Sequence, residues 1–376
     1  MPYTAPTVNY SATNNGTYTT LTGVQSVSIR RGRQRFQDPV TQSICTIELI
    51  PANSYALPLA IGQFIDVRDA NTSTSPCYFT GQITDVTRSY DIPYNSTTGA
   101  APGDRITITA SGGTGAIGSA TLTGYSMPSQ GVALSLQDII SSVGVYWLAS
   151  ENLVLNSAQT LNTSALDAVN TLLQTGQYLI DDLDRQRTGT TRAIYFYPIR
   201  GRNTYGFSYS DTGATRFKTL EYQSSAQNTF NYVEVEPAGL TAQVTKAGSG
   251  SYNALNYKTF NRNTADALSL SGYLYNLLSG QLAPVPFTIT TDTTVASNCM
   301  SVSILATGSS LIALLGEVVT ITFRGTTVSA QILGITSNFY LDRASVQLYF
   351  SPSLGVPFTL DSTTNGVLDT NRLGYP

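Results

Sequence analysis

The sequence predicts a mainly β fold with an α+β insert, in which two pseudo-equivalent β-barrel domains are joined by a small helix-hairpin unit. Two observations lead to this prediction. Strands with alternating apolar residues dominate both ends of the chain, and helical apolar spacing is concentrated between them. In addition, a strand block that opens with a glycine and an alternating apolar run occurs twice, at 62–110 and at 316–350.

The first barrel is expected over 21–118, after an N-terminal arm (1–20) that is rich in Thr, Asn and Tyr. Period-2 alternation and turn residues between the runs define its strands. These strands are Val24–Arg30, Ser43–Pro51, Phe64–Arg68, Tyr78–Tyr90 and Arg105–Ala110.

The insert is expected over 119–215. Ser135–Val143 is predicted as a short helix with Ser135 as its N-cap, and 164–174 as a clearer helix ended by Gly176. The strands Tyr178–Asp182 and Arg192–Pro198 then form a hairpin. Helix followed by hairpin indicates a small α/β unit.

The second barrel, with one helix, is expected over 216–352, and a C-terminal arm over 353–376. Asn228–Glu236 is predicted as its opening strand and Asn263–Gly280 as its helix. Further strands are predicted at Val302–Ala306, Val318–Phe323, Ser329–Thr336 and Ala344–Phe350. The arm carries spaced apolar residues, which are candidate anchors on a neighbouring subunit: Phe358, Leu360, Val367 and Leu368.

Composition favours a protein that makes wide contacts with other subunits. Of the 376 residues, 41% are hydrophobic and only 11% are charged, against about 25% charged in an average domain. A neutral, polar surface requires little ion desolvation on contact. A secreted β-rich protein could have the same composition. The net charge of −3 gives no general basic field for nucleic acid.

Enzyme chemistry is disfavoured by the residue inventory. The chain has no histidine, which removes Ser-His-Asp, Cys-His and His-metal sites. Cys45, Cys77 and Cys299 fit no zinc or redox spacing. We therefore expect no enzyme activity, no cofactor and no metal. No signal peptide and no apolar run of about 20 residues is visible, so we expect no membrane insertion by this chain.

Three local motifs have competing interpretations. Gly113–Gly118 matches G-x-G-x-x-G, but no βαβ unit surrounds it, so a flexible connector is favoured over nucleotide binding. Asp181, Asp182 and Asp184 could form an acid pair for glycoside hydrolysis or bind calcium, but a solvated turn is favoured. The many tyrosines, such as Tyr195, could form a sugar-binding platform, but scattered interface residues are favoured.

The basic run between Arg30 and Arg35 is the fourth candidate. Its four arginines could contact a neighbouring subunit, line a channel that meets the tape measure or DNA, or lie in an exposed loop. The guanidinium fork forms bidentate pairs with carboxylates, which favours the subunit contact. The candidate residues are Arg30, Arg31, Arg33 and Arg35.

The order of these features resembles the tail hub (baseplate hub) family of tailed bacteriophages, the minor tail proteins of long-tailed phages. The resemblance covers about 21–376. The segments that carry it are Val27–Arg30, Ile44–Leu49, Gly62–Val67, Phe79–Val86, Ala165–Leu173, Tyr178–Asp181, Ile194–Phe196, Asn228–Val235, Phe358–Asp361 and Gly366–Asp369.

The resemblance implies a structural virion protein at the distal end of the tail, assembled in the host cytoplasm. It implies a homotrimeric ring whose two barrels per chain give pseudo-sixfold symmetry. Such a ring would adapt a sixfold tail to a threefold tip and surround the channel for the tape measure protein and, transiently, DNA. Its partners would be the distal tail protein ring, the tape measure protein and other minor tail proteins.

Two other classes remain open at this stage. A receptor-binding tail adhesin that contacts host-surface carbohydrate would also be β-rich and rich in Tyr, Thr and Asn. A carbohydrate-active enzyme would need an acid pair in a cleft, for which the sequence offers only the aspartates near residue 181.

Overall fold

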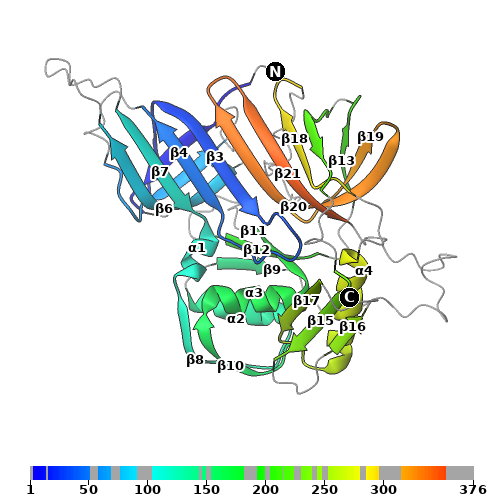
Figure 1. Ribbon diagram of the computed structural model, residues 1–376. Helices are drawn as coiled ribbons and strands as arrows, with labels where there is room; N and C mark the ends of the chain where they lie inside the picture. Colours follow the sequence, from blue (N-terminus) through cyan, green and yellow to red (C-terminus); the bar gives the residue numbers. More distant parts are fainter. Residues whose placement is uncertain are drawn as a thin grey trace, which may run out of the picture.

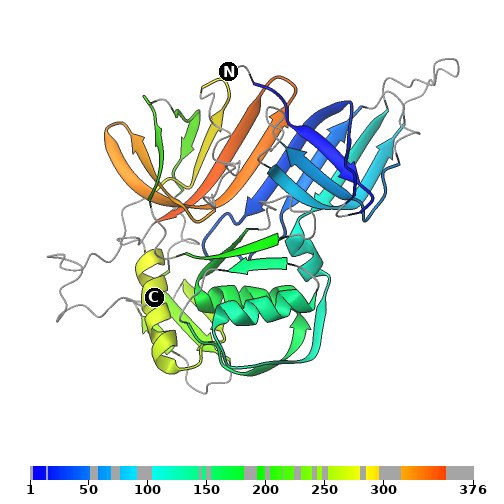
Figure 2. The ribbon, with the colours of Figure 1, turned by 180° about the vertical axis from the view of Figure 1, so that it is seen from behind.

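The computed structural model describes residues 3–13, 16–50, 58–68, 77–90, 104–143, 146–149, 154–181, 193–199, 204–213, 215–223, 230–238, 244–247, 253–279, 285–295 and 315–352. This part of the chain is mainly β. The strands of one large sheet lie on one side of the molecule, and a body of helices and small sheets lies against them (Figures 1 and 2). No helix in the described ranges is long and apolar enough to cross a membrane.

The large sheet has 13 strands and draws on both ends of the chain. Alternation places one face of each strand in the core: in β3, Val27 and Ile29 are buried while Ser28 and Arg30 are exposed. The strands are β1 (Thr7–Ser11), β2 (Thr19–Thr20), β3 (Val24–Gly32), β4 (Ile44–Leu49), β5 (Phe64–Arg68), β6 (Cys77–Ser89), β7 (Arg105–Ser111), β13 (Thr204–Ser210), β14 (Thr219–Glu221), β18 (Thr288–Asp292), β19 (Val318–Phe323), β20 (Thr326–Tyr340) and β21 (Ala344–Pro352).

The sheet contains the same five-strand unit twice. In the first repeat (β3 to β7) the spatial order is β5-β6-β7-β4-β3, and in the second repeat (β14 and β18 to β21) it is β19-β20-β21-β18-β14. Every pairing within both units is antiparallel. Strands at the same position in the two spatial orders also follow one another in the same order along the chain. The duplication expected from the sequence is therefore present in the strand order.

The flanking strands of the two repeats differ. β1 pairs antiparallel with β5, whereas β13 pairs parallel with β19. An isolated bridge between Ser210 and Arg216 brings β13 next to the segment that leads into β14. The pairings among the described residues close neither repeat into a barrel, so the two-barrel detail stays a prediction.

The body under the sheet begins directly after β7. Helices α2 and α3 pack on each other, and buried residues of both form one apolar cluster with strand residues of the body. Its elements are α1 (Gly113–Gly118), β8 (Thr121–Met127), α2 (Val132–Ser142), β9 (Tyr146–Ala149), β10 (Gln159–Ser164), α3 (Ala165–Gly176), β11 (Tyr178–Asp181) and β12 (Ala193–Pro198).

A second small unit completes the body. It consists of the sheet β16-β15-β17 and helix α4, which packs on β15 and β16. The elements are β15 (Tyr232–Pro237), β16 (Val244–Ala247), β17 (Ala254–Thr259) and α4 (Thr264–Leu278). The sequence assigned this strand and this helix to the second barrel. The structure differs because the leucine stripe of α4 is buried with Val233 and Val235 in a cluster of its own.

Three local expectations are corrected. The helix expected from Ser135 begins at Val132 after Gly131, and the buried Ser135 hydroxyl instead donates to Asn156 Oδ1 at 2.8 Å. The glycine-rich connector forms α1, held by the buried Ile117. The described part of the N-terminal arm includes β1, whose buried Val8 anchors it to the sheet. By contrast, β5 and β19 have the expected bounds.

Candidate assembly surface

Each repeat contains the same hydrogen-bonded corner. Gly62 and Gly316 both have positive φ, +89° and +83°, and both precede the first strand of the block. The Gly62 amide donates to Ile83 O at 2.8 Å, and the Gly316 amide donates to Ile332 O at 2.7 Å. A positive φ at both positions explains why glycine stands there.

A buried or half-buried glutamine closes each corner. Gln82 Nε2 donates to the Gly62 carbonyl at 2.6 Å, and Gln331 Nε2 donates to the Gly316 carbonyl at 2.9 Å. Gln82 lies opposite Ser111, and Gln331 lies opposite Ser351. Immediately after the glutamine and the following isoleucine, both strands carry a register shift. The repeats therefore correspond residue by residue around the corner.

The two repeats are joined through β20. Its first part pairs with β19, and its part beyond the register shift pairs antiparallel with β3, from Gly334 opposite Gly32 to Tyr340 opposite Ser26. The Ser28 hydroxyl donates to Asn338 Oδ1 at 2.7 Å across this junction. Phe339, 2% exposed, meets Tyr78 of the first repeat edge-on, with ring centroids 4.6 Å apart.

Glycine is required where the junction strands cross most closely. Gly32 has φ +74°, and a Cβ there would overlap the Leu333 carbonyl oxygen and lie 3.0 Å from both Gly334 Cα and Leu315 Cδ2. A Cβ on Gly334 would overlap the Arg33 carbonyl oxygen. The junction is thus specific in shape as well as in hydrogen bonding.

The basic run divides into buried and accessible residues. Arg31 and Arg33 are 3% and 7% exposed, whereas Arg30 is exposed and Arg35 is half-buried. Arg31 Nη1 lies 3.4 Å from Asp181 Oδ1, so the pair links β3 to β11. The burial of Arg31 and Arg33 is at odds with a subunit-contact or channel-lining role for these two. For Arg30 and Arg35 that role stays a prediction.

Arg33 is held in the interior of the body. Its guanidinium carbon lies 4.7 Å from the centroid of the Phe36 ring, an arrangement in which the cation is attracted to the aromatic face. Burial lowers the pKa of Arg33, while the neighbouring Tyr257 and Asp38 oppose that shift. Arg31 and Arg33 therefore fasten the junction to the α/β body.

The face of the sheet opposite the apolar core is polar and carries few charges. In the centre of the sheet it presents hydroxyl and amide side chains, with Arg30 beside Thr336 and the exposed Glu48 between Ser26 and Thr107. Its uncharged members include Ser26, Ser28, Thr46, Thr107, Thr109, Thr336, Asn338 and Gln347. The neutral surface expected from composition thus includes one continuous sheet face.

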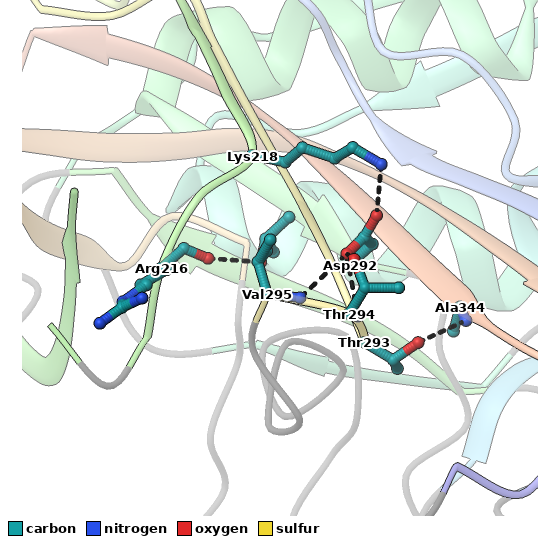
Figure 3. A network of polar contacts seen from close by, with 8 residues as sticks. Arg216, Lys218, Asp292, Thr293, Thr294, Val295 and Ala344 are labelled. Carbon is teal, nitrogen blue, oxygen red and sulfur yellow. Dashed lines mark hydrogen bonds and ion pairs between the residues drawn. The ribbon is translucent and has the colours of Figure 1, made fainter. Parts of the chain in front are cut away.

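A polar network fixes the outermost strand, β14 (Figure 3). Lys218 Nζ lies 2.8 Å from Asp292 Oδ2, and the Lys218 amide donates to Thr290 O at 2.7 Å. Asp292 Oδ1 also accepts from the amides of Thr294 and Val295 at 2.9 and 3.2 Å. Burial alone would raise the pKa of Asp292, but these hydrogen bonds lower it to about 2.

The other sequence candidates have different outcomes. Asp181 is buried in the ion pair with Arg31, whereas Asp182 and Asp184 lie outside the described residues. The described ranges hold no cluster of three metal-ligating side chains. Cys45 and Cys77 are buried thiols, and Cys299 lies outside the described residues. The anchors Phe358, Leu360, Val367 and Leu368 also lie outside them.

Comparison with known proteins finds no matching family model and no matching curated sequence. Solved structures do match over nearly the whole chain. The 43 kDa tail protein of prophage MuSo2 from Shewanella oneidensis has a TM-score of 0.61 and 13% identity, covering 92% of this chain and 98% of its own. A tail protein from Neisseria meningitidis MC58 has a TM-score of 0.61 and 10% identity, covering 93% and 97%.

The chain therefore has the fold of these phage tail proteins. A third structure with this fold is the E. coli c3393 protein, with a TM-score of 0.50 and 11% identity, covering 94% of this chain and 77% of its own. It is described as a type VI secretion system component that is structurally similar to the phage T4 tail proteins gp27 and gp5. The tail-family resemblance drawn from the sequence is therefore confirmed at the level of the fold.

The sequence analysis missed several residues of this tail-type fold. The glutamines of the two corners were not singled out, although both stand directly before an isoleucine in the repeated block. The burial of Arg31 and Arg33 was also missed. The period-2 pattern held the signal, because Val27, Ile29, Arg31 and Arg33 are all odd-numbered residues of one strand and its extension.

Proposed function

We propose that the chain is a structural tail hub (minor tail) protein, of which three copies form a ring of six similar repeats. The ring adapts a sixfold tail to a threefold tip and surrounds the channel for the tape measure protein and DNA. The observation that carries this proposal is the duplicated strand order together with the β20–β3 junction. Two similar units per chain make three chains sufficient for six units around an axis, joined by heterologous contacts.

Two further features support a channel role. The polar face of the sheet has hydroxyl and amide side chains and few charges, so neither the tape measure protein nor DNA would be held strongly. Buried residues of β1, β5, β13 and β19 belong to the apolar cluster of the sheet, and in the proposed ring the opposite, polar face lines the lumen. In this arrangement Arg30 faces the channel.

The role is structural rather than catalytic. The chain has no histidine, and Asp181 is engaged with Arg31. The partners are the distal tail protein ring, the tape measure protein and other minor tail proteins, at the distal end of the tail. The C-terminal arm, through Phe358, Leu360, Val367 and Leu368, contacts a neighbouring subunit. Full burial of each such side chain would contribute about 1.5–3 kcal/mol before ordering costs.

Gold-labelled antibodies against this chain, applied to purified tails of particles that contain it, test this proposal. The expected result is one label cluster at the distal end of the tail, on the axis of the tube. Label along peripheral fibres would favour the adhesin alternative. Label spread along the tube would contradict a hub role.

A further inference from the structure

We propose that the buried guanidinium of Arg33 binds a small inorganic anion, for which chloride is the expected species. Arg33 directly follows β3, at the place where this strand leaves the large sheet and meets β11 of the body (Figure 1). The proposal does not depend on the ring, because every residue of the site belongs to one chain. Its failure would therefore leave the proposed function untouched.

The open part of the Arg33 side chain is one edge of its guanidinium plane. Arg33 is 7% exposed, and its Nε and Nη2 atoms are buried without a hydrogen-bond partner. The N–H bonds of these two nitrogens run parallel and form the fork with which arginine holds an anion. Buried charged donors that lack an acceptor are costly. An acceptor that reaches both nitrogens at once is therefore expected.

The charge of Arg33 also lacks a counter-ion. Asp38 is near enough to favour the charged form, but it forms no ion pair with Arg33. Asp38 Oδ2 instead accepts from the Arg35 amide at 2.9 Å, which holds this carboxylate on its own turn. Arg31 shows the contrast, because its Nη1 lies 3.4 Å from Asp181 Oδ1. Of the two buried arginines, Arg33 is thus the one that needs a negative charge from outside the chain.

Tyr257 supplies a neutral donor at the same place. It is 4% exposed, and its hydroxyl lies close to the guanidinium. Burial raises the pKa of Tyr257, although Arg33 and Gln177 oppose that shift, so the phenol stays protonated at neutral pH. A neutral hydroxyl does not balance the charge of Arg33. It can, however, donate a hydrogen bond to an anion that the fork holds.

The enclosure of the site selects a small ion. Phe36 packs on the guanidinium, whose Cζ lies 4.7 Å from the ring centroid, and Phe36 and Gln177 are 3% and 4% exposed. A carboxylate side chain of a partner protein, or a phosphate ester, would need an opening through these residues. A monatomic anion needs only a space slightly larger than that of one water molecule.

Water is the competing occupant of the fork. A water molecule could accept from the same N–H groups and donate to Gln177 Oε1, which is also buried without a partner. It would leave the positive charge of Arg33 uncompensated in an interior where charges are poorly screened. This difference in charge is the reason why the anion is favoured.

An anion at Arg33 would stabilise the joint between the two repeats and the body. The Arg33 amide donates to Leu333 O at 3.0 Å, so the residue belongs to the junction of β3 with β20. Phe36, Leu333 and Tyr257 share one apolar cluster with the buried leucines of α4. A ligand that binds only this folded arrangement raises the folding constant by mass action.

Urea unfolding of the purified full-length protein, with sodium chloride replaced stepwise by sodium gluconate at constant ionic strength, tests the site. Gluconate is too large for the enclosure. We expect the folding constant to rise about tenfold for each tenfold increase in chloride above the dissociation constant, and bromide to replace chloride. Arg33→Met should lose this dependence. Arg30→Met, which removes an exposed arginine of the same strand, should keep it.

Bromide diffraction from crystals of the unaltered protein is the independent measurement, because Arg33→Met also removes a packed side chain. The expected result is an anomalous peak beside Nε and Nη2 of Arg33. Water in the fork without a bromide peak would overturn the proposal, and so would an equal chloride dependence of the unaltered protein and Arg33→Met. A bromide peak without any effect of chloride on stability would mean an adventitious ion only, which also contradicts a structural anion.

Discussion

Replacing Gly32 with alanine tests the junction between the two repeats. The residue has φ +74°, and an added Cβ would overlap the Leu333 carbonyl oxygen and lie 3.0 Å from Gly334 Cα. Gly325 is a matched control, because its φ is +79° and a Cβ there meets nothing within 4 Å. Both substitutions have the same cost of about 1–2 kcal/mol for a left-handed conformation and the same gain from a less flexible unfolded chain.

The difference between the two variants therefore isolates the close approach of β3 and β20. Overpacking against backbone costs about 1–3 kcal/mol. Urea unfolding followed by circular dichroism should show Gly32→Ala less stable than Gly325→Ala by that amount. Equal free energies of unfolding, within about 0.5 kcal/mol, would show that the strands are not this close in solution and would refute the reasoning.

Two further predictions concern the polar contacts. Asp292→Asn should lower the free energy of unfolding by about 1–3 kcal/mol at neutral pH. Because the pKa of Asp292 is depressed to about 2, its contribution is present above the ordinary pKa and is lost as the pH falls towards 2, so acid unfolding curves of the variant should lack that loss. Arg31→Met should lower the free energy of unfolding by about 3–5 kcal/mol, because the buried Asp181 carboxylate loses the charge of Arg31. Arg30→Met on the exposed face should change it by no more than about 0.5 kcal/mol. Equal effects of the two substitutions in thermal unfolding would contradict the assigned positions.

The repeated block was predictable because it depends on local rules. The sequence of each block shows a glycine with positive φ, then strands with period-2 alternation that are joined by short connections. The strands β5 and β19 accordingly have the expected bounds. Helices α3 and α4 were also visible, since Ser164 and Asn263 cap them through the side-chain hydrogen bonds that such residues favour.

The association between distant segments was not predictable from these rules. The strand 232–237 has the same alternating pattern whether it joins the large sheet or a small one. Which sheet it joins depends on the strand with which it pairs. The pairing of β3 with β20 joins residues about 300 positions apart in the sequence. The buried arginines also depend on a distant segment. A charged residue such as Arg31 is expected at the surface, and its burial is explained only by Asp181, which lies beside it in the fold.

Single-particle electron microscopy of the purified full-length protein tests the central claim most directly. The proposal predicts rings of three chains, with six similar lobes around a central channel and the second repeat of each chain beside the first repeat of the next. Rings of six chains, or a single copy on the axis, would contradict it.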